Sequence, residues 1–139
     1  MVEQIILLDA EQLVYDLLTR ANPGKRIIPE TDSDSLGDLP LWQFNVLGDG
    51  QTFNGPGEWD IILDINVFGN GIAAAKAEAA IAYQTVWGWA SDPLSAIVDG
   101  VGWVSDVSDI SYFSRAGTPD LTGLNVSQYA ASFGLTLRN

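Results

Sequence analysis

Hydrophobic and polar residues alternate along the segment from Tyr129 to Asn139. The apolar side chains fall at every second position: Tyr129, Ala131, Phe133, Leu135 and Leu137. This period of two is typical of a strand with one buried face and one exposed face. Because a terminal segment frays unless it is tied into a sheet, we expect this strand to be a structural part of the fold.

Two earlier segments alternate in the same way and predict a β-hairpin with a long loop. In residues 41–47 the apolar face consists of Trp42, Phe44 and Val46. In residues 59–68 it consists of Trp59, Ile61, Leu63, Ile65 and Val67. The glycine-rich residues 48–58 connect the two strands, and a further strand is predicted over residues 102–115.

Apolar residues at helical spacing predict an α-helix over residues 10–21. Asp9 and Gln12 occupy the two side-chain positions of a capping box, in which each side chain bonds the backbone of the other residue. Leu8 and Leu13 stand where a hydrophobic staple would pack the incoming chain against the first turn. The start of this helix is therefore well defined by the sequence.

A second helix is predicted over residues 71–87, with Asn70 as its N-cap. The segment is rich in alanine, and its only charged residues are Lys76 and Glu78. A helix with so little polar surface is expected to be covered on more than one side. In a chain of this length, a neighbouring copy of the protein can provide the second cover.

Length and composition narrow the function classes. The 139 residues predict one domain, residues 1–139, and the net charge of −12 argues against ordinary binding of duplex DNA, whose phosphates it repels. Cysteine and histidine are absent, which excludes a thiol nucleophile, a thiolate metal site and a Ser-His-Asp triad. No apolar run approaches the roughly 20 residues that cross a bilayer, and the first residues lack the basic region of a secretory signal.

Two acidic segments are candidate sites, but each lacks part of what its chemistry requires. The first has a partial calcium-loop spacing at Asp32, Asp34, Gly37 and Asp38. Leu36 and Gln43 stand where that loop needs further oxygen ligands. Asp60 and Asp64 share a strand face, but about 13 Å of strand separates them, too far for a carboxylate pair. We therefore assign no catalytic residue, metal ligand or cofactor, and we expect no enzyme.

The five tryptophans fall into two groups. Their parity places Trp42, Trp59 and Trp103 on apolar strand faces, so we expect them in the core. Trp87 and Trp89 stand at the end of the second helix. Because indoles are enriched at protein interfaces, these two are candidates for an exposed subunit contact.

Two arginines and two alanines complete the candidate subunit interface. The chain has only six basic residues against eighteen acidic ones, so an ion pair across a subunit boundary would fix the register of the subunits. Arg115 and Arg138, which follow or close a strand, are candidates for that role. Ala73 and Ala77 are candidates because their small side chains would allow another backbone to come close.

The order of the segments is itself informative. An amphipathic helix (DAEQLVYDLLTRA) is followed by a Leu-Pro strand (LPLWQFNVL), a strand containing DINVF, an alanine-rich helix, and a closing strand (QYAASFGLTLR). This order, over nearly the whole chain, resembles the tail terminator proteins of long-tailed, non-contractile bacteriophages. The shared features are architectural, and none of them is a catalytic signature.

The resemblance implies an α+β fold, in which two main α-helices pack on a mixed, mostly antiparallel β-sheet. It also implies a homohexameric ring that caps the tail tube, ends tail polymerisation and forms part of the neck of the virion after assembly in the host cytoplasm. The implied partners are copies of the chain itself, the tail tube protein, and the neck or head-completion (stopper) protein. No membrane is involved, and DNA passes through the ring without specific binding.

The acidic composition fits that implied channel. Six copies would carry about −72 formal charges, which would repel the phosphates of passing DNA. We therefore expect acidic loop residues to face the channel, namely Asp32, Asp34, Asp38 and Asp49. The placement is wrong if these loops lie away from the central hole.

Three other functions remain open on the sequence alone. Another neck, head-completion or minor tail protein of the same virion would share a small α/β fold and ring symmetry. A carbohydrate-binding module is favoured by the tryptophans, glycines and acidity, although the two predicted helices argue against its usual all-β fold. An enzyme is the third, and it lacks an activated nucleophile or base.

Overall fold

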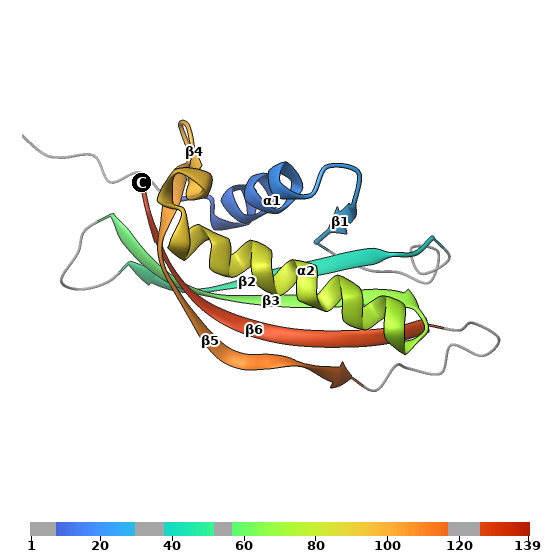
Figure 1. The fold of residues 1–139 in the computed structure, drawn as a ribbon. Helices are drawn as coiled ribbons and strands as arrows, with labels where there is room; N and C mark the ends of the chain where they lie inside the picture. The colour runs from blue at the N-terminus through green and yellow to red at the C-terminus, as the bar shows by residue number, and fades with distance from the viewer. Residues whose placement is uncertain (1–7, 30–37, 52–56, 117–125) are drawn as a thin grey trace, which may run out of the picture.

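The computed structural model describes residues 8–29, 38–51, 57–116 and 126–139. In chain order the elements are α1 (Ala10–Ala21), β1 (Arg26–Ile28), β2 (Leu41–Gln51), β3 (Glu58–Asn70), α2 (Ile72–Ser91), the 3₁₀ helix η2 (Pro93–Ala96), β4 (Ile97–Val98), β5 (Gly102–Ala116) and β6 (Val126–Arg138) (Figure 1). The predicted helices and long strands are all present, and most extend a few residues beyond the predicted bounds.

Within the described residues the strands form one six-stranded sheet in the order β1-β2-β3-β6-β5-β4. β1 pairs with β2 in parallel, and the other neighbours pair antiparallel. The predicted hairpin is the β2–β3 pair. The C-terminal strand β6 lies between β3 and β5, so it is paired on both sides, which explains its regular alternation. The fold is therefore α+β with a mixed, mostly antiparallel sheet, as the sequence indicated.

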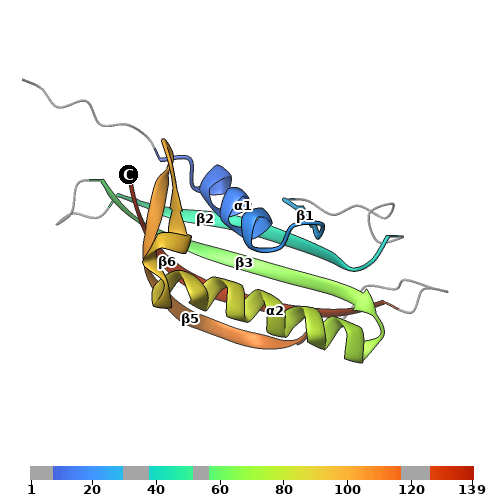
Figure 2. The same ribbon diagram turned by 45° about the horizontal axis from the view of Figure 1, so that its top comes forward.

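Both helices cover the same face of the sheet (Figure 2). α2 packs across β3, β5 and β6, while α1 contacts β1, β2 and β4. The core lies between the helices and the strands, and its largest side chains with almost no exposure are Trp42, Phe44, Phe133, Leu13, Leu17, Leu18, Leu63, Ile65, Leu135 and Leu137. The predicted apolar faces of β2, β3 and β6 contribute the strand residues of this set, and α1 contributes Leu13, Leu17 and Leu18.

The start of α1 confirms half of the predicted capping box. The backbone N–H of Gln12 donates to Oδ1 of Asp9 at 3.0 Å, which satisfies one of the free donors of the first turn. The side chain of Gln12 instead donates to Oδ1 of Asp16 at 2.7 Å. Leu8 and Leu13 are both buried in the core, as a hydrophobic staple requires.

The start of α2 differs from the prediction. The N-cap is Gly71, with φ at 87° and no side-chain cap, rather than Asn70. Glycine is favoured here because a positive φ strains other residues. Gly69, at the end of β3, is also required, because a Cβ there would lie 2.6 Å from the backbone nitrogen of Ala75. The helix therefore begins close against the strand that precedes it.

Candidate assembly surfaces

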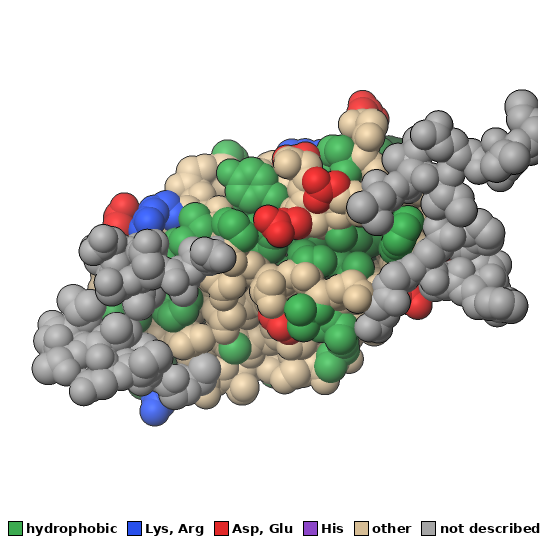
Figure 3. All heavy atoms as spheres, turned by 180° about the vertical axis from the view of Figure 1, so that it is seen from behind, with side chains coloured by type: hydrophobic (Ala, Val, Ile, Leu, Met, Phe, Trp, Pro, Cys, Tyr) green, Lys and Arg blue, Asp and Glu red, His purple; other side chains and the backbone are tan. Residues whose placement is uncertain are grey.

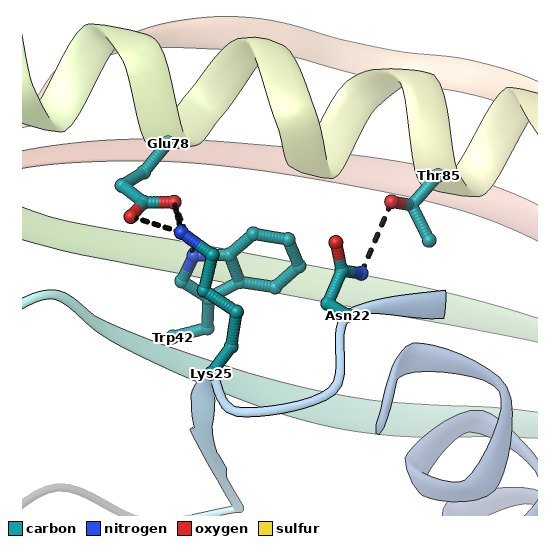
Figure 4. Close-up of polar contacts among 5 residues, drawn as sticks. All are labelled: Asn22, Lys25, Trp42, Glu78 and Thr85. Carbon is teal, nitrogen blue, oxygen red and sulfur yellow. Dashed lines mark hydrogen bonds and ion pairs between the residues drawn. The ribbon is translucent and has the colours of Figure 1, made fainter. Parts of the chain in front are cut away.

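A buried polar network fixes α2 on the sheet (Figure 4). The Lys25 ammonium lies 2.6 and 2.9 Å from the two carboxylate oxygens of Glu78, and the indole N–H of Trp42 donates to Glu78 Oε2 at 3.2 Å. Glu78 is the one buried charged residue among the described residues. Because an unpaired buried carboxylate is costly, this network holds α2 in one rotational setting about its axis.

A second polar contact joins the end of α1 to α2. The side-chain amide of Asn22, the C-cap of α1, donates to Thr85 Oγ1 at 3.2 Å and also to the carbonyl of Leu18 at 3.1 Å (Figure 4). Together with Lys25–Glu78, this contact ties the segment after α1 to two points on α2. The two helices therefore present a fixed outer surface.

The outward side of α2 carries almost no charge. At helical spacing, Ala73, Ala77, Ala80 and Gln84 lie opposite the buried residues Ala75, Ala79, Ala82 and Val86, and all four are exposed. Lys76 is the only exposed charged residue of the helix. The chain itself thus covers only the sheet-facing side of α2, and the second cover predicted from the sequence is not provided within the described residues.

An aromatic cluster of Tyr83, Trp87 and Tyr112 lies between α2 and β5, and two of its members bond Asp109. The carboxylate of Asp109 accepts hydrogen bonds from the Tyr83 hydroxyl at 2.8 Å and from the Trp87 indole N–H at 2.9 Å. The ring of Tyr112 meets that of Tyr83 edge-on at 5.4 Å and is 69% exposed. The register shift between Val104 and Asp106 places Asp109 opposite Phe133 on the helix side, and the shifts on both sides of Ser111 allow Tyr112 to reach the same side.

This arrangement perturbs one titration. The hydrogen bond to Asp109 raises the pKa of Tyr83 above its ordinary value, and desolvation and the negative charge of Asp109 act in the same direction. The neutral hydroxyl of Tyr83 is therefore held as a donor toward Asp109. The sequence did not identify Tyr83 and Asp109 as site residues, because the contact between them depends on the irregular register of β5.

The opposite face of the sheet has no helix on it, and we call it the open sheet face. The register of β2, β3, β5 and β6 and the contact of Ile110 with Gly134 assign to the centre of this face Asn45, Leu47, Asp60, Ile62, Asp64, Asn66, Asp106, Ser108, Ile110, Ser132, Gly134 and Thr136. Hydrophobic and acidic side chains are interspersed across the middle of this face (Figure 3). Asp60 and Asp64 do share a face, as the sequence indicated, and each accepts a hydrogen bond from a hydroxyl on β6.

Two of the predicted tryptophan positions are wrong. Trp89 is 3% exposed and belongs to the core, because α2 continues to Ser91 and places it at helical spacing from Val86. Trp103 was expected in the core and is 38% exposed, because it pairs with Arg138 on the open sheet face, while the next residue, Val104, takes the covered face. Trp87 is half-buried and bonded to Asp109, whereas Trp42 is buried and Trp59 packs against the core.

The predicted arginines and alanines occupy different environments. Arg138 lies 2.7 Å from Glu58 of its own chain, so it already has one carboxylate partner within the chain. Arg115 is exposed on β5 and forms no ion pair with any described carboxylate. Ala73 and Ala77 are exposed on the outward side of α2. Of these candidates, Arg115, Ala73 and Ala77 are available to a neighbouring molecule.

The predicted acidic channel residues are described only in part. Asp32 and Asp34 lie outside the described residues, as does the side chain of Asp49. The side chain of Asp38 is exposed and lies 3.6 Å from Arg26. In the part of the chain that the structure describes, no three acidic side chains come together as metal ligands, and no helix has the length and apolarity to span a membrane.

No protein-family model matches the chain, and no curated protein matches it significantly. The functional argument therefore rests on the chain's own surfaces. These are the outward side of α2, the aromatic cluster at Asp109, and the open sheet face.

Proposed function

We propose that this protein is a structural component of a virion, the tail terminator of a long-tailed, non-contractile phage. It caps the tail tube as a homohexameric ring, ends tail polymerisation and forms part of the neck through which DNA passes. The order of its elements supports this proposal. Its partners in this role are its own copies, the tail tube protein and the head-completion protein.

The observation that carries the proposal is the outward side of α2, on which Lys76 is the only charged residue. The chain has a net charge of −12, so copies repel one another unless they meet where charge is sparse. Ala73, Ala77 and Ala80 form such a place, and their small side chains allow close backbone approach. Protein surfaces that resemble a core in composition are typical of permanent subunit interfaces.

A charge placed on α2 tests this proposal. Ala77→Glu adds a carboxylate at the centre of the outward side, and we expect it to abolish rings that the unaltered protein forms alone or on tail tubes from the phage that encodes it. Ala21→Glu makes the same change at the exposed end of α1 and should leave rings intact. Negative-stain images and native mass spectrometry over a range of concentrations provide the measurement. Rings of Ala77→Glu, or the absence of rings from the unaltered protein on tubes, would contradict the proposal.

A carbohydrate-binding module is a second candidate because of the aromatic cluster. The exposed ring of Tyr112 can stack on a sugar, and the carboxylate of Asp109, which the neighbouring Tyr83 bonds, can accept hydrogen bonds from sugar hydroxyls. Tryptophan fluorescence during titration with soluble oligosaccharides would test it, because Trp87 bonds Asp109 directly. A saturating change that Tyr112→Ala removes would favour this candidate over the ring.

A further inference from the structure

The open sheet face contains a row of apolar side chains that crosses the sheet. Leu47 on β2 pairs with Ile62 on β3, and Ile62 pairs with Gly134 on β6. Ile110 of β5 extends over Gly134, since its Cδ1 lies 3.7 Å from where a Cβ of Gly134 would stand. Leu47 is 51% and Ile110 56% exposed. Large apolar side chains that gather on an exposed surface typically mark an interaction site.

Carboxylates flank this row on both sides. Asp64 stands on one side, held by the hydroxyl of Ser132, and Asp60 stands on the other, held by the hydroxyl of Thr136 at 3.0 Å. Asp106 pairs with Thr136 from β5, and so extends the second acidic side. The partners of Asp60 and Asp64 are neutral hydroxyls, so the negative charges are oriented but not compensated.

Positive charge is sparse on the described part of the same surface. Arg26 on β1 and Arg138 on β6 have the parity of this face, but both stand at its ends and are already paired, with Asp38 and Glu58 respectively. The face therefore presents an apolar centre between two negatively charged borders. A ligand that matches it has an apolar centre between positively charged borders.

Other occupants fit this surface less well. A second copy meeting it face to face would bring Asp60, Asp64 and Asp106 of both copies together, with like charges opposed. DNA is repelled by the same carboxylates. A wall past which DNA merely slides would have no need of exposed Leu47 and Ile110, whose contact with water is unfavourable.

We propose that the open sheet face is a docking surface for a basic amphipathic segment of another protein. The apolar side chains of that segment lie on Leu47, Ile62 and Ile110, and its Lys or Arg side chains reach the carboxylates at the borders. This is the usual division of labour at interfaces, where apolar anchors supply affinity and charges supply orientation. The proposal goes beyond the ring, because it concerns the face opposite α2.

A variant with an added negative charge in the apolar row distinguishes this proposal from binding by opposite charge alone. The probe is a labelled synthetic peptide of lysine and leucine arranged as an amphipathic helix, measured by fluorescence anisotropy. Ile110→Asp should weaken binding about tenfold, the order expected for the loss of one buried aliphatic side chain. If only charge mattered, the additional carboxylate would tighten binding. Ile81→Asp, an exposed position on α2, is the matched control and should retain the affinity.

A second pair of variants tests the borders. Asp106→Asn should weaken peptide binding several-fold, while Asp92→Asn, an exposed aspartate at the end of α2, should leave it unchanged. Leu47→Asp serves as the alternative if Ile110→Asp fails to fold by circular dichroism. Amide shifts in a labelled sample should map to β2, β3, β5 and β6 rather than to α2.

Three results would overturn the proposal. They are no binding of the peptide to the unaltered protein, equal losses in Ile110→Asp and Ile81→Asp, and concentration-dependent shifts of the open sheet face without peptide, which would identify a second copy as the occupant. Because Ala77→Glu alters α2 and Ile110→Asp alters the opposite face, loss of rings and loss of peptide binding are distinguishable outcomes.

Discussion

The two faces of the sheet are formed by the same strands but differ in burial and in how their carboxylates are partnered. On the helix-covered face, Phe44, Leu63 and Phe133 are fully buried, and Glu78, the one buried carboxylate in the described part of the chain, is paired with Lys25 and bonded by Trp42. On the open sheet face, Asp60 and Asp64 remain accessible beside Ile62, and their partners are hydroxyls. The first face has the composition of a core, and the second has that of a surface prepared for contact.

This difference shows which positions can be substituted to change stability and which to change recognition. Because side chains alternate along a strand, neighbouring residues such as Ile62 and Leu63 belong to different faces. A substitution on the covered face removes packed volume, whereas one on the open face mainly changes what the surface presents. Variants of neighbouring residues can therefore test the comparison directly.

The largest expected effect is on the covered face. Phe133→Ala removes a ring packed against Phe113 and Tyr83, and we expect a loss of about 3–5 kcal/mol in the free energy of unfolding. Ile62→Ala, on the open sheet face, should cost about 1 kcal/mol. Urea denaturation of both variants measures the contrast. Equal losses would show that the open face is as tightly packed in solution as the covered one.

A smaller effect is expected from the buried polar network. Glu78→Ala leaves the Lys25 ammonium and the Trp42 indole N–H without their acceptor. We expect a loss of about 2–3 kcal/mol, below that of a fully buried pair because the Lys25 side chain is 29% exposed. Glu11→Ala, exposed on α1, is the control and should change stability by at most about 0.5 kcal/mol. Glu78→Gln retains an acceptor, so its loss of stability should fall between those of Glu78→Ala and Glu11→Ala. If the loss equals that of Glu78→Ala, the charge of Glu78 alone stabilises the network.

The smallest effect concerns the aromatic cluster. Asp109→Asn weakens the hydrogen bond that is the main cause of the raised pKa of Tyr83 and removes the negative charge that adds to it, so the titration of Tyr83 should move toward the ordinary tyrosine value of about 10. Because the folded-state pKa is raised, the stability that the Tyr83 proton contributes is fully present below that ordinary value. It is lost as the pH rises through the raised pKa.

Ultraviolet absorbance of tyrosinate follows this titration. Asp106→Asn removes the same charge from the open sheet face and should leave the absorbance curve unchanged. If both variants shift the curve equally, the general charge of the protein, and not the hydrogen bond from Tyr83 to Asp109, controls the ionisation.

Local pattern was enough to predict the elements and which strand faces are buried. The alternation in β6 correctly identified Phe133, Leu135 and Leu137 as core residues. The same reasoning placed Asp60 and Asp64 together on one face. These predictions succeed because a regular strand in the middle of a sheet leaves its side chains only two directions.

Features that depend on distant partners were not predictable. β1 has only three residues, and its parallel pairing with β2 has no local signal. The register shifts in β5 decide that Asp109 meets Tyr83 and Trp87, and alternation alone cannot locate such shifts. Trp89 was misplaced because one more turn of α2 brings it back to the buried side. The Lys25–Glu78 pair joins residues far apart in sequence, so only the folded chain reveals it.

The ion pairs have a consequence for the conditions under which copies can meet. Lys25, Arg26 and Arg138, half of the six basic residues, are each matched with a carboxylate of the same chain. Little positive charge is left to draw one copy toward another. Dissolved counterions must therefore screen the repulsion between copies, which at 0.1 M ionic strength reduces it to a range of about 10 Å. The salt concentration should thus determine whether copies approach one another, and low salt should keep them apart.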